Sequence, residues 1–234
     1  MRFDAGVFWH LLFSDAFLRP AWITVWVTFA AMTIGIVLGL VGGLAAASSL
    51  RAVRVAVRCY VVVFRGLPTL VQIVFWYDAL AELTGNWINL PALAAGVLAL
   101  GVNEGAYMTE IVRAGLGAVE HGQREAARSL GLSVWQVQRL VVIPQAIRPA
   151  IPPTVGFLVH LVKNTALASV IGFLELTRAG QIVANVTFQP LPVFLTVGAG
   201  YFILCYPLSL ASRALERRLG TARLHLAYEQ GGLE

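Results

Sequence analysis

The chain has very few charged side chains for its length. Only 12% of its 234 residues are Asp, Glu, Lys or Arg, whereas 58% are hydrophobic and the mean hydropathy is +0.76. A soluble domain usually carries about 25% charged residues. The composition therefore excludes an ordinary soluble domain and predicts a membrane protein with several spans.

Lysine is nearly absent, and this absence bears on the energy supply. The only lysine is Lys163, and the residues before it, Val-His-Leu-Val, do not form a glycine-rich loop. A P-loop needs Gly-x-x-x-x-Gly-Lys-Ser/Thr, because its backbone N–H groups and its lysine hold the phosphates. We therefore expect no cofactor on this chain. If ATP drives the protein, another polypeptide binds it.

Cysteine is scarce as well. Cys59 and Cys205 fall in or beside apolar segments, where an isolated thiol is usually a small apolar side chain. We assign no disulfide and no metal site. A nucleophile, a base and an orienting group do not occur in one recognisable arrangement, so we do not expect an enzyme.

Long apolar segments are what the chain does have. A transmembrane helix needs about 20 mostly apolar residues, and only helices or closed barrels satisfy the backbone in lipid. Because no barrel-type alternation is visible, we predict a single all-α membrane domain over residues 1–234. The second segment is interrupted by Gly66 and Pro68, and we expect residues 51–65 to form a basic helix along the inner membrane surface. The candidate spans, about five, are residues 22–47, 58–80, 91–112, 150–172 and 192–212.

Basic residues predict the orientation of these spans. Arginines gather after the first span, between the third and fourth, and in the tail, so these regions should face the cytosol. The amino terminus is then outside and the carboxyl terminus cytosolic. The net charge of +5 reflects this topology and gives no support for nucleic-acid binding. The arginines concerned are Arg51, Arg54, Arg58, Arg65, Arg113, Arg124, Arg128, Arg139, Arg148, Arg213, Arg217, Arg218 and Arg223.

A polar segment, residues 120–144, interrupts this apolar chain within a cytosolic loop of about 113–149. Its pattern predicts a helix over 122–130, a left-handed stop at Gly131, and a second helix that Ser133 opens with Gln136 three residues later. We expect Pro144 to end the second helix. Such a segment is suited to bind a water-soluble partner.

This polar segment resembles the EAA loop of ABC-transporter permeases. The family pattern is Glu-Ala-Ala, three residues, Gly, nine residues, Ile, one residue, Leu-Pro, and here Val141 and Ile143 replace the Ile and the Leu. The resemblance implies that the segment docks on the ATPase subunit, where Glu125 pairs with a basic group and Gly131 lets the backbone turn inside a cleft. The matching residues are Glu125, Ala126, Ala127, Gly131 and Pro144.

Further segments resemble one subfamily, the permeases for polar amino acids of the histidine, glutamine and arginine type. The matches are residues 64–72, 105–115, 163–172 and 175–180. The resemblance implies a multi-pass protein of the bacterial inner membrane that takes up a polar amino acid. It also implies two ATPase subunits that bind ATP and Mg, a second permease copy or a related chain, and an external substrate-binding protein.

Polar residues inside the spans are the candidates for substrate contact, because charge in hydrocarbon is costly and tends to face a cavity. A zwitterionic amino acid needs an anionic group for its ammonium and a donor-rich group for its carboxylate. Glu104, with Lys163 or Asn164, provides both. The full candidate set is Gln72, Asn103, Glu104, Tyr107, Lys163, Asn164 and Thr165.

A purely structural role for these residues is also open. Glu104 and Lys163 would then pair with one another or with a partner subunit, and Asn103 and Thr165 would bond backbone groups between helices. Glu110 lies near the cytosolic end of its span, where we expect a structural pair with Arg113. Glycines at small-residue spacing in the first span, Gly35, Gly39, Gly42 and Gly43, predict a packing face.

Two other functions compete with the importer. A proton- or sodium-coupled carrier would need its own coupling carboxylates and an inverted internal repeat, and no convincing repeat is visible. A membrane-anchored assembly or sensor subunit would have no transport path, so neutralising Glu104 would change nothing beyond stability.

Overall fold

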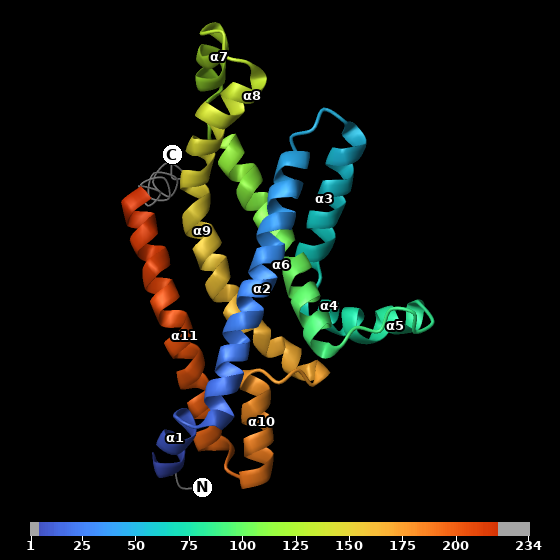
Figure 1. The fold of residues 1–234 in the computed structure, drawn as a ribbon, viewed down its shortest axis with the longest axis vertical. Helices are drawn as coiled ribbons and strands as arrows, with labels where there is room; N and C mark the ends of the chain where they lie inside the picture. Colours follow the sequence, from blue (N-terminus) through green and yellow to red (C-terminus); the bar gives the residue numbers. More distant parts are fainter. Residues whose placement is uncertain (1–4, 220–234) are drawn as a thin grey trace, which may run out of the picture.

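The computed structural model describes residues 5–219, and these residues form helices joined by short connections (Figure 1). This agrees with the all-α prediction. Helices α2, α3, α6, α9 and α11 run along the long axis of the molecule, and α7 and α8 project from one end. The α-helices are α1 (Ala5–Leu12), α2 (Asp15–Ala45), α3 (Arg51–Gly66), α4 (Thr69–Val74), α5 (Leu80–Leu83), α6 (Ala92–Gly117), α7 (His121–Ser129), α8 (Val134–Val137), α9 (Ile143–Asn164), α10 (Leu176–Thr187) and α11 (Pro190–Leu219). The other segments are the π-helical η1 (Phe75–Ala79) and η2 (Gln138–Val142) and the 3₁₀-helical η3 (Thr165–Ile171).

Three helical stretches among the described residues are long and apolar enough to cross a membrane: Asp15–Ala45, Val134–Ile171 and Pro190–Leu219. A fourth follows if Arg51–Gly66 and Thr69–Leu83 count as one bent span. Helix α6 is not among them, since Asn103, Glu104 and Glu110 lower its hydropathy. The described residues therefore contain three to four candidate spans, and a crossing over residues 91–112 stays a prediction.

Helices α2 and α6 pack closely because small residues line their contact. A β-carbon at Gly35 would lie 2.9 Å from the β-carbon of Glu104, and one at Gly39 would collide with Met108. Helix α6 also contributes a glycine to this contact, because a β-carbon at Gly101 would lie 2.8 Å from the β-carbon of Ile34 in α2. The predicted glycine packing face is confirmed, and it brings the backbones of α2 and α6 together.

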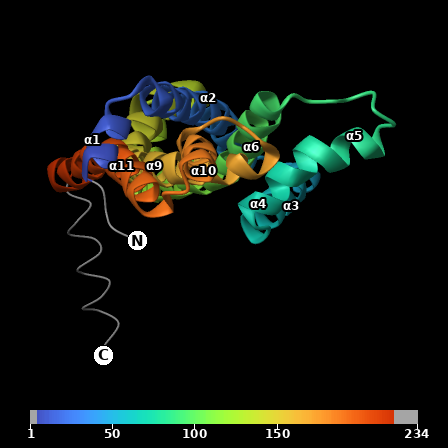
Figure 2. The same ribbon diagram turned by 90° about the horizontal axis from the view of Figure 1, so that it is seen from below.

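The chain bends by 106° between α3 and α4, within the predicted span 58–80. Leu67 has an extended backbone, as expected for a residue before proline. Pro68 lies just before the first turn of α4, where its missing N–H costs no helical hydrogen bond. The expectation of a surface helix over 51–65 is wrong: α3 runs beside α6, and Tyr60 donates a 2.6 Å hydrogen bond to the carbonyl of Val102. Seen along the long axis, α3, α4 and α5 lie to one side of the other helices (Figure 2).

Pro144 does not end a helix, contrary to the prediction. The stretch from Val134 to Ile171 is continuous, and Pro144 lies in the first turn of α9. The preceding turn, η2, is a π-helix. Proline has no N–H and crowds the carbonyl four residues earlier, and a widened turn before it removes that conflict.

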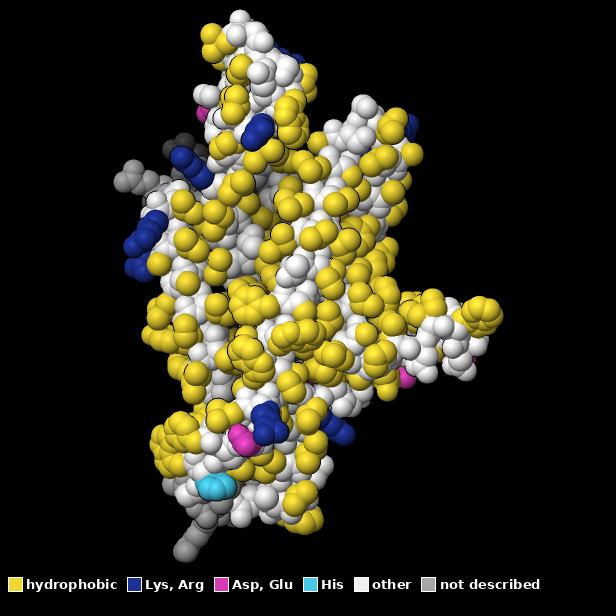
Figure 3. All heavy atoms as spheres, in the orientation of Figure 1, with side chains coloured by type: hydrophobic (Ala, Val, Ile, Leu, Met, Phe, Trp, Pro, Cys, Tyr) yellow, Lys and Arg dark blue, Asp and Glu magenta, His cyan; other side chains and the backbone are white. Residues whose placement is uncertain are grey.

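Basic residues gather toward one end of the molecule. The start of α3, the α7–α8 region and the carboxyl end of α11 lie at this end (Figure 1), and most Lys and Arg side chains visible in Figure 3 lie toward it. The sides of the helices are covered with apolar side chains (Figure 3). The arginines at the start of α3, in the α7–α8 region and at the end of α11 follow the predicted grouping, whereas Arg65 lies at the opposite end of α3 and Arg223 lies outside the described residues.

Candidate functional site

A polar groove of about 410 Å³ lies where α3, α6 and α9 meet. Arg65 from the last turn of α3 faces Tyr107 and Glu110 of α6. The α9 wall is formed by Phe157 and two prolines inside that helix. The groove therefore combines a cation, an anion and aromatic rings along one face of α6. Its lining residues are Arg65, Tyr107, Glu110, Ile111, Ala114, Gly115, Pro149, Pro153 and Phe157.

Glu110 is shared between two arginines. Its carboxylate lies 2.6 Å from the guanidinium of Arg113 and 3.9 Å from that of Arg65. The predicted pair with Arg113 is confirmed. Arg65 also lies 5.2 Å from the centre of the Tyr107 ring, a cation–π distance. Arg65 is thus only weakly held by Glu110 and is available to an anionic group in the groove.

Sequence reasoning missed Arg65 and Phe157 as groove residues. The sequence marks Arg65 as a topological charge and as part of the 64–72 resemblance, but not as a substrate candidate, although its place before Gly66 and Pro68 puts it at the bend of the chain. The Phe157 ring lies 4.9 Å from that of Tyr107. An apolar residue in an apolar helix gives no sequence signal that it lines a groove.

Asn103 and Gln72, both predicted to contact substrate, serve the backbone here. The Asn103 amide donates to the carbonyl of Phe64 at 2.8 Å, and the Gln72 amide donates to the same carbonyl and to that of Leu67. Carbonyls in the last turn of a helix lack intrahelical partners, so the two amides cap α3 at the bend. The structure therefore brings these two side chains together, for a structural purpose.

Glu104 is buried between α6 and α2. It is 1% exposed, it packs against Gly35, and its Oε1 has no hydrogen-bond partner among the described residues. Lys163 is exposed, and no ion pair joins the two within residues 5–219. The predicted pairing of Glu104 with Lys163 is therefore not seen. A buried carboxyl without a partner is costly, so the structure gives no account of Glu104; Oε1 of Gln72 is likewise buried without a partner among the described residues.

Lys163, Asn164 and Thr165 mark the point where α9 tightens into η3. Asn164 is half-buried and lies 3.3 Å from Nδ1 of His160, while Thr165 is buried and donates to the carbonyl of Val162 at 2.7 Å. Thr165 thus bonds the backbone of its own helix and not that of another helix, which the structural alternative expected; of the two, only Asn103 bonds a different helix. Of the predicted candidates, Tyr107 is the one that lines the polar groove.

The hairpin of residues 121–142 has the predicted local structure. Helix α7 ends before Gly131, whose φ of +81° is left-handed, and Ser133 forms a capping box with Gln136. We call these residues the hairpin. Ala127 is buried in it, whereas Ala126 and Gly131 are exposed. Glu125 is exposed and lies 3.2 Å from His121.

Large apolar side chains are exposed at the tip of the hairpin, away from the apolar sides of the long helices. Leu130 is 83% exposed, Trp135 is 68% exposed, and Val134 is exposed beside them. Exposed apolar groups of this size beside a polar helix are typical of a protein contact. The hairpin is therefore suited to enter a cleft on a soluble protein.

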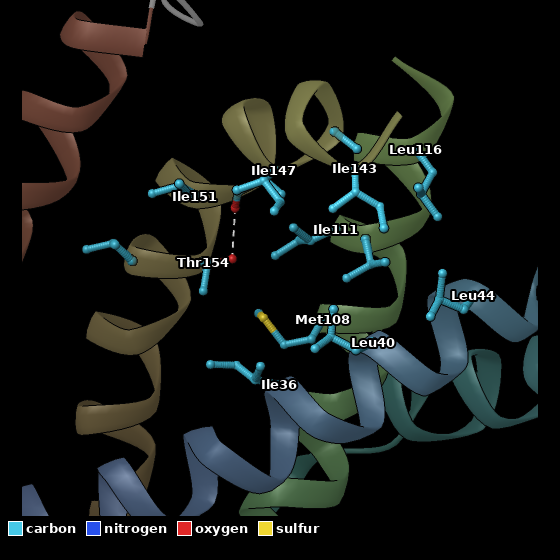
Figure 4. A pocket seen from close by; sticks show the side chains of 14 residues that line it. Ile36, Leu40, Leu44, Met108, Ile111, Leu116, Ile143, Ile147, Ile151 and Thr154 are labelled. Atoms are coloured by element: carbon cyan, nitrogen blue, oxygen red, sulfur yellow. Dashed lines mark hydrogen bonds between the residues drawn. The ribbon is translucent and has the colours of Figure 1, made fainter. Parts of the chain in front are cut away.

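A second hollow, of about 340 Å³, lies between α2, α6 and α9. Figure 4 shows side chains such as Leu40, Met108 and Ile147 pointing into it. Its only polar side chain is Thr154, whose hydroxyl donates to the carbonyl of Ala150 at 2.8 Å. This apolar hollow offers no group that binds a charged solute, whereas the polar groove does.

The fold and the sites define a polytopic helical membrane protein with a polar groove and a helical hairpin at its basic end. Residues 35–221 match the family model described as "binding-protein-dependent transport system inner membrane component". The chain belongs to this family, whose members are multi-pass components of the inner membrane. The membrane component is distinct from the ATPase of such a system.

Relatives of known name agree with the family. The chain is 34% identical to the probable amino-acid permease protein YxeN of Bacillus subtilis, over 90% of this chain and 95% of that protein. It is 33% identical to the glutamine transport system permease protein GlnP of Escherichia coli K12, over 94% and 99% of the two chains. These relatives span nearly the full length of the chain.

Solved structures agree in fold. A chain from the crystal structure of an amino acid ABC transporter with histidines superposes with a TM-score of 0.83 at 37% identity, covering 93% of this chain and all of that one. A chain of the inward-facing MetNI methionine ABC transporter superposes with a TM-score of 0.73 at 23% identity, covering 93% of this chain and 99% of that one. At the latter identity only the fold is shared.

Proposed function

We propose that this chain is the permease subunit of an ATP-driven importer for polar amino acids. The observation that carries the proposal is the hairpin: a capped pair of short helices with an apolar exposed tip, on a family member that lacks a P-loop. A permease of this kind needs a site through which a separate ATPase moves it. The hairpin, with Glu125, Ala126, Ala127 and Gly131, is that site, together with Pro144, which follows it in the first turn of α9.

The proposed membrane arrangement has five crossings in one domain, residues 1–234. Helix α6 is the central crossing, because it packs against both α2 and α9 and carries the polar groove. The basic end of the molecule faces the cytosol. The amino terminus is then outside and the carboxyl terminus inside, which puts the hairpin on the side where ATP is available.

The polar groove is the proposed transport path. Arg65 supplies a cation for a substrate carboxylate, and Tyr107 and Phe157 supply aromatic walls. Glu104, one residue from the Asn103 cap and buried without a partner, is the anion proposed for a substrate ammonium when α2 and α6 separate. Relatives named for glutamine and a homologous transporter solved with histidines support an amino acid as the solute.

The proposed complex has four further kinds of component. Two copies of an ABC ATPase bind ATP and Mg, and a second permease copy or a paralogue completes the path. An extracytoplasmic binding protein delivers the amino acid. ATP closes the ATPase pair, the hairpins follow, and the two permeases open the path alternately outward and inward. Nucleic acid has no role in this scheme.

Copurification of the ATPase tests the docking site. Gly131→Leu places a side chain on a left-handed residue at the exposed turn, and Glu125→Lys reverses an exposed charge. Each variant should insert into the membrane at the normal level and lose the ATPase. Ser129→Ala is the matched control, because its hydroxyl bonds only its own helix, at the carbonyl of Glu125. Normal recovery of the ATPase with both docking variants would refute the assignment.

A further inference from the structure

The hairpin continues directly into α9, and a small apolar cluster also fixes it to the rest of the molecule. Val119, Ala127, Val137 and Val142 are buried together with Ala146 of α9. This cluster fixes the two arms of the hairpin to each other and to the start of α9. It accounts for how the hairpin stays folded, but it involves α6 only through the packing of Leu116.

A single arginine makes the polar connection to α6. Arg124, in the first turn of α7, donates from Nη2 to the carbonyl of Leu116 at 2.7 Å. Leu116 lies in the last turn of α6, where carbonyls lack intrahelical partners and the helix dipole favours a cation. Nε of Arg124 is buried and has no partner among the described residues. Arg124 is thus partly buried, and its guanidinium is held by this carbonyl.

The bonded carbonyl is close, along the helix, to the polar groove. Glu110 and Tyr107 precede Leu116 on α6, and a rise of 1.5 Å per residue places Glu110 about 9 Å from it. Beyond Leu116, residues 118–120 form only a short connection to α7. The other arm of the hairpin continues without a break into α9, which forms the opposite wall of the groove. The Arg124 bond is therefore the direct link from α7 to the α6 wall, and without it the short connection of residues 118–120 absorbs more of the displacement of α7.

We propose that Arg124 is a positioning residue that transmits movement of the hairpin to α6 and so to the polar groove. This inference rests on the proposed function, since it presupposes that an ATPase moves the hairpin. Arg124 acts on no substrate. Its role is separate from docking, because its guanidinium is turned toward α6 while the exposed tip of the hairpin faces away.

Arg124→Met tests this role, because methionine keeps much of the apolar stem and removes every donor. The complex of permease, ATPase and binding protein is reconstituted in liposomes, and uptake of labelled glutamine and histidine is measured per ATP hydrolysed. We expect uptake per ATP to fall about tenfold, within the range of measured coupling between sites. Arg124→Lys should recover part of it, since lysine restores one charged donor. Arg148→Gln, an exposed arginine on α9, should behave as wild type.

Three results would overturn the inference. Normal uptake per ATP in Arg124→Met would show that the bond transmits nothing. Loss of the ATPase from this variant would show a docking role instead. A defect in Arg124→Met that lysine does not relieve would show that only packing matters. Failure of the proposed function is distinguishable from all three, because wild type itself would then take up no amino acid with ATP.

Discussion

The last turn of α3 is held by two side-chain amides that converge on one carbonyl. Asn103 and Gln72 both donate to the carbonyl of Phe64, from different helices. Their chemistry suits an amino acid substrate, but the bend at Gly66–Pro68 leaves helix-end carbonyls that need donors more directly. At the scale of the residue, then, polarity in a span identifies an important position without identifying what it bonds.

Asn103→Leu should lower the free energy of unfolding by about 0.5–1.5 kcal/mol, because it removes one of the two donors to the Phe64 carbonyl and leaves the Gln72 amide. The measurement is the thermal unfolding midpoint of the purified permease in detergent. Asn164→Leu is the comparison, since Asn164 is half-buried and its contact is His160 in its own helix. Equal midpoints for Asn103→Leu and wild type would contradict the capping role.

Individual residues were predicted unevenly for a physical reason. The Glu110–Arg113 pair follows from spacing within one helix, and it was predicted. Arg65 reaches the same carboxylate from another helix, at a bend whose direction the sequence does not encode locally. The sequence correctly predicts that Glu104 lies inside the protein. It predicts a partner for the carboxyl as well, but one oxygen of Glu104 has no partner among the described residues.

Helices are positioned in this molecule by close backbone contact more than by polar bonds. Glycines of α2 face Glu104, Met108, Thr109 and Val112 of α6. Without a hydrophobic driving force between helices in lipid, such small-residue contacts let van der Waals packing hold the pair together. Helix α6, with its polar residues, is stabilised in this way by its neighbour.

Gly39→Leu should prevent α2 and α6 from packing, because the first carbon of any side chain there meets Met108. We expect little monodisperse protein after purification, measured by size-exclusion chromatography in detergent. Gly198→Leu in α11 is the control, since nothing lies within 4 Å of a β-carbon built there. A normal yield of the Gly39 variant would show that the seam is looser than described.

Proline was the main source of error at the level of helices. The sequence correctly placed the left-handed stop at Gly131 and the cap at Ser133, because both depend on a few adjacent residues. Pro144 was expected to stop a helix and instead follows a π-turn inside one. Pro68 is recognisable in the sequence as an interruption. The 106° bend between α3 and α4 also depends on the helices that pack against each of them, which the local sequence does not show.

The whole molecule combines three parts that one sequence pattern cannot relate to each other: an apolar bundle, a polar groove and a hairpin at the basic end. Composition predicts the bundle, and the helix stop at Gly131 with the cap at Ser133 predicts the hairpin. The groove was found only in part, because it arises where α3, α6 and α9 meet. Helix α6 links all three, since it carries groove residues and ends at the carbonyl that Arg124 binds.

ATP-dependent uptake by reconstituted liposomes is the most direct test of the account. Wild-type permease with its ATPase and binding protein should take up labelled glutamine or histidine only when ATP is present on the hairpin side. Glu104→Gln should keep the ATPase and lose or alter this uptake, because it removes the carboxyl that is proposed to bind the substrate ammonium. Uptake driven by a proton or sodium gradient without ATP would contradict the account, and would make the chain an ion-coupled carrier.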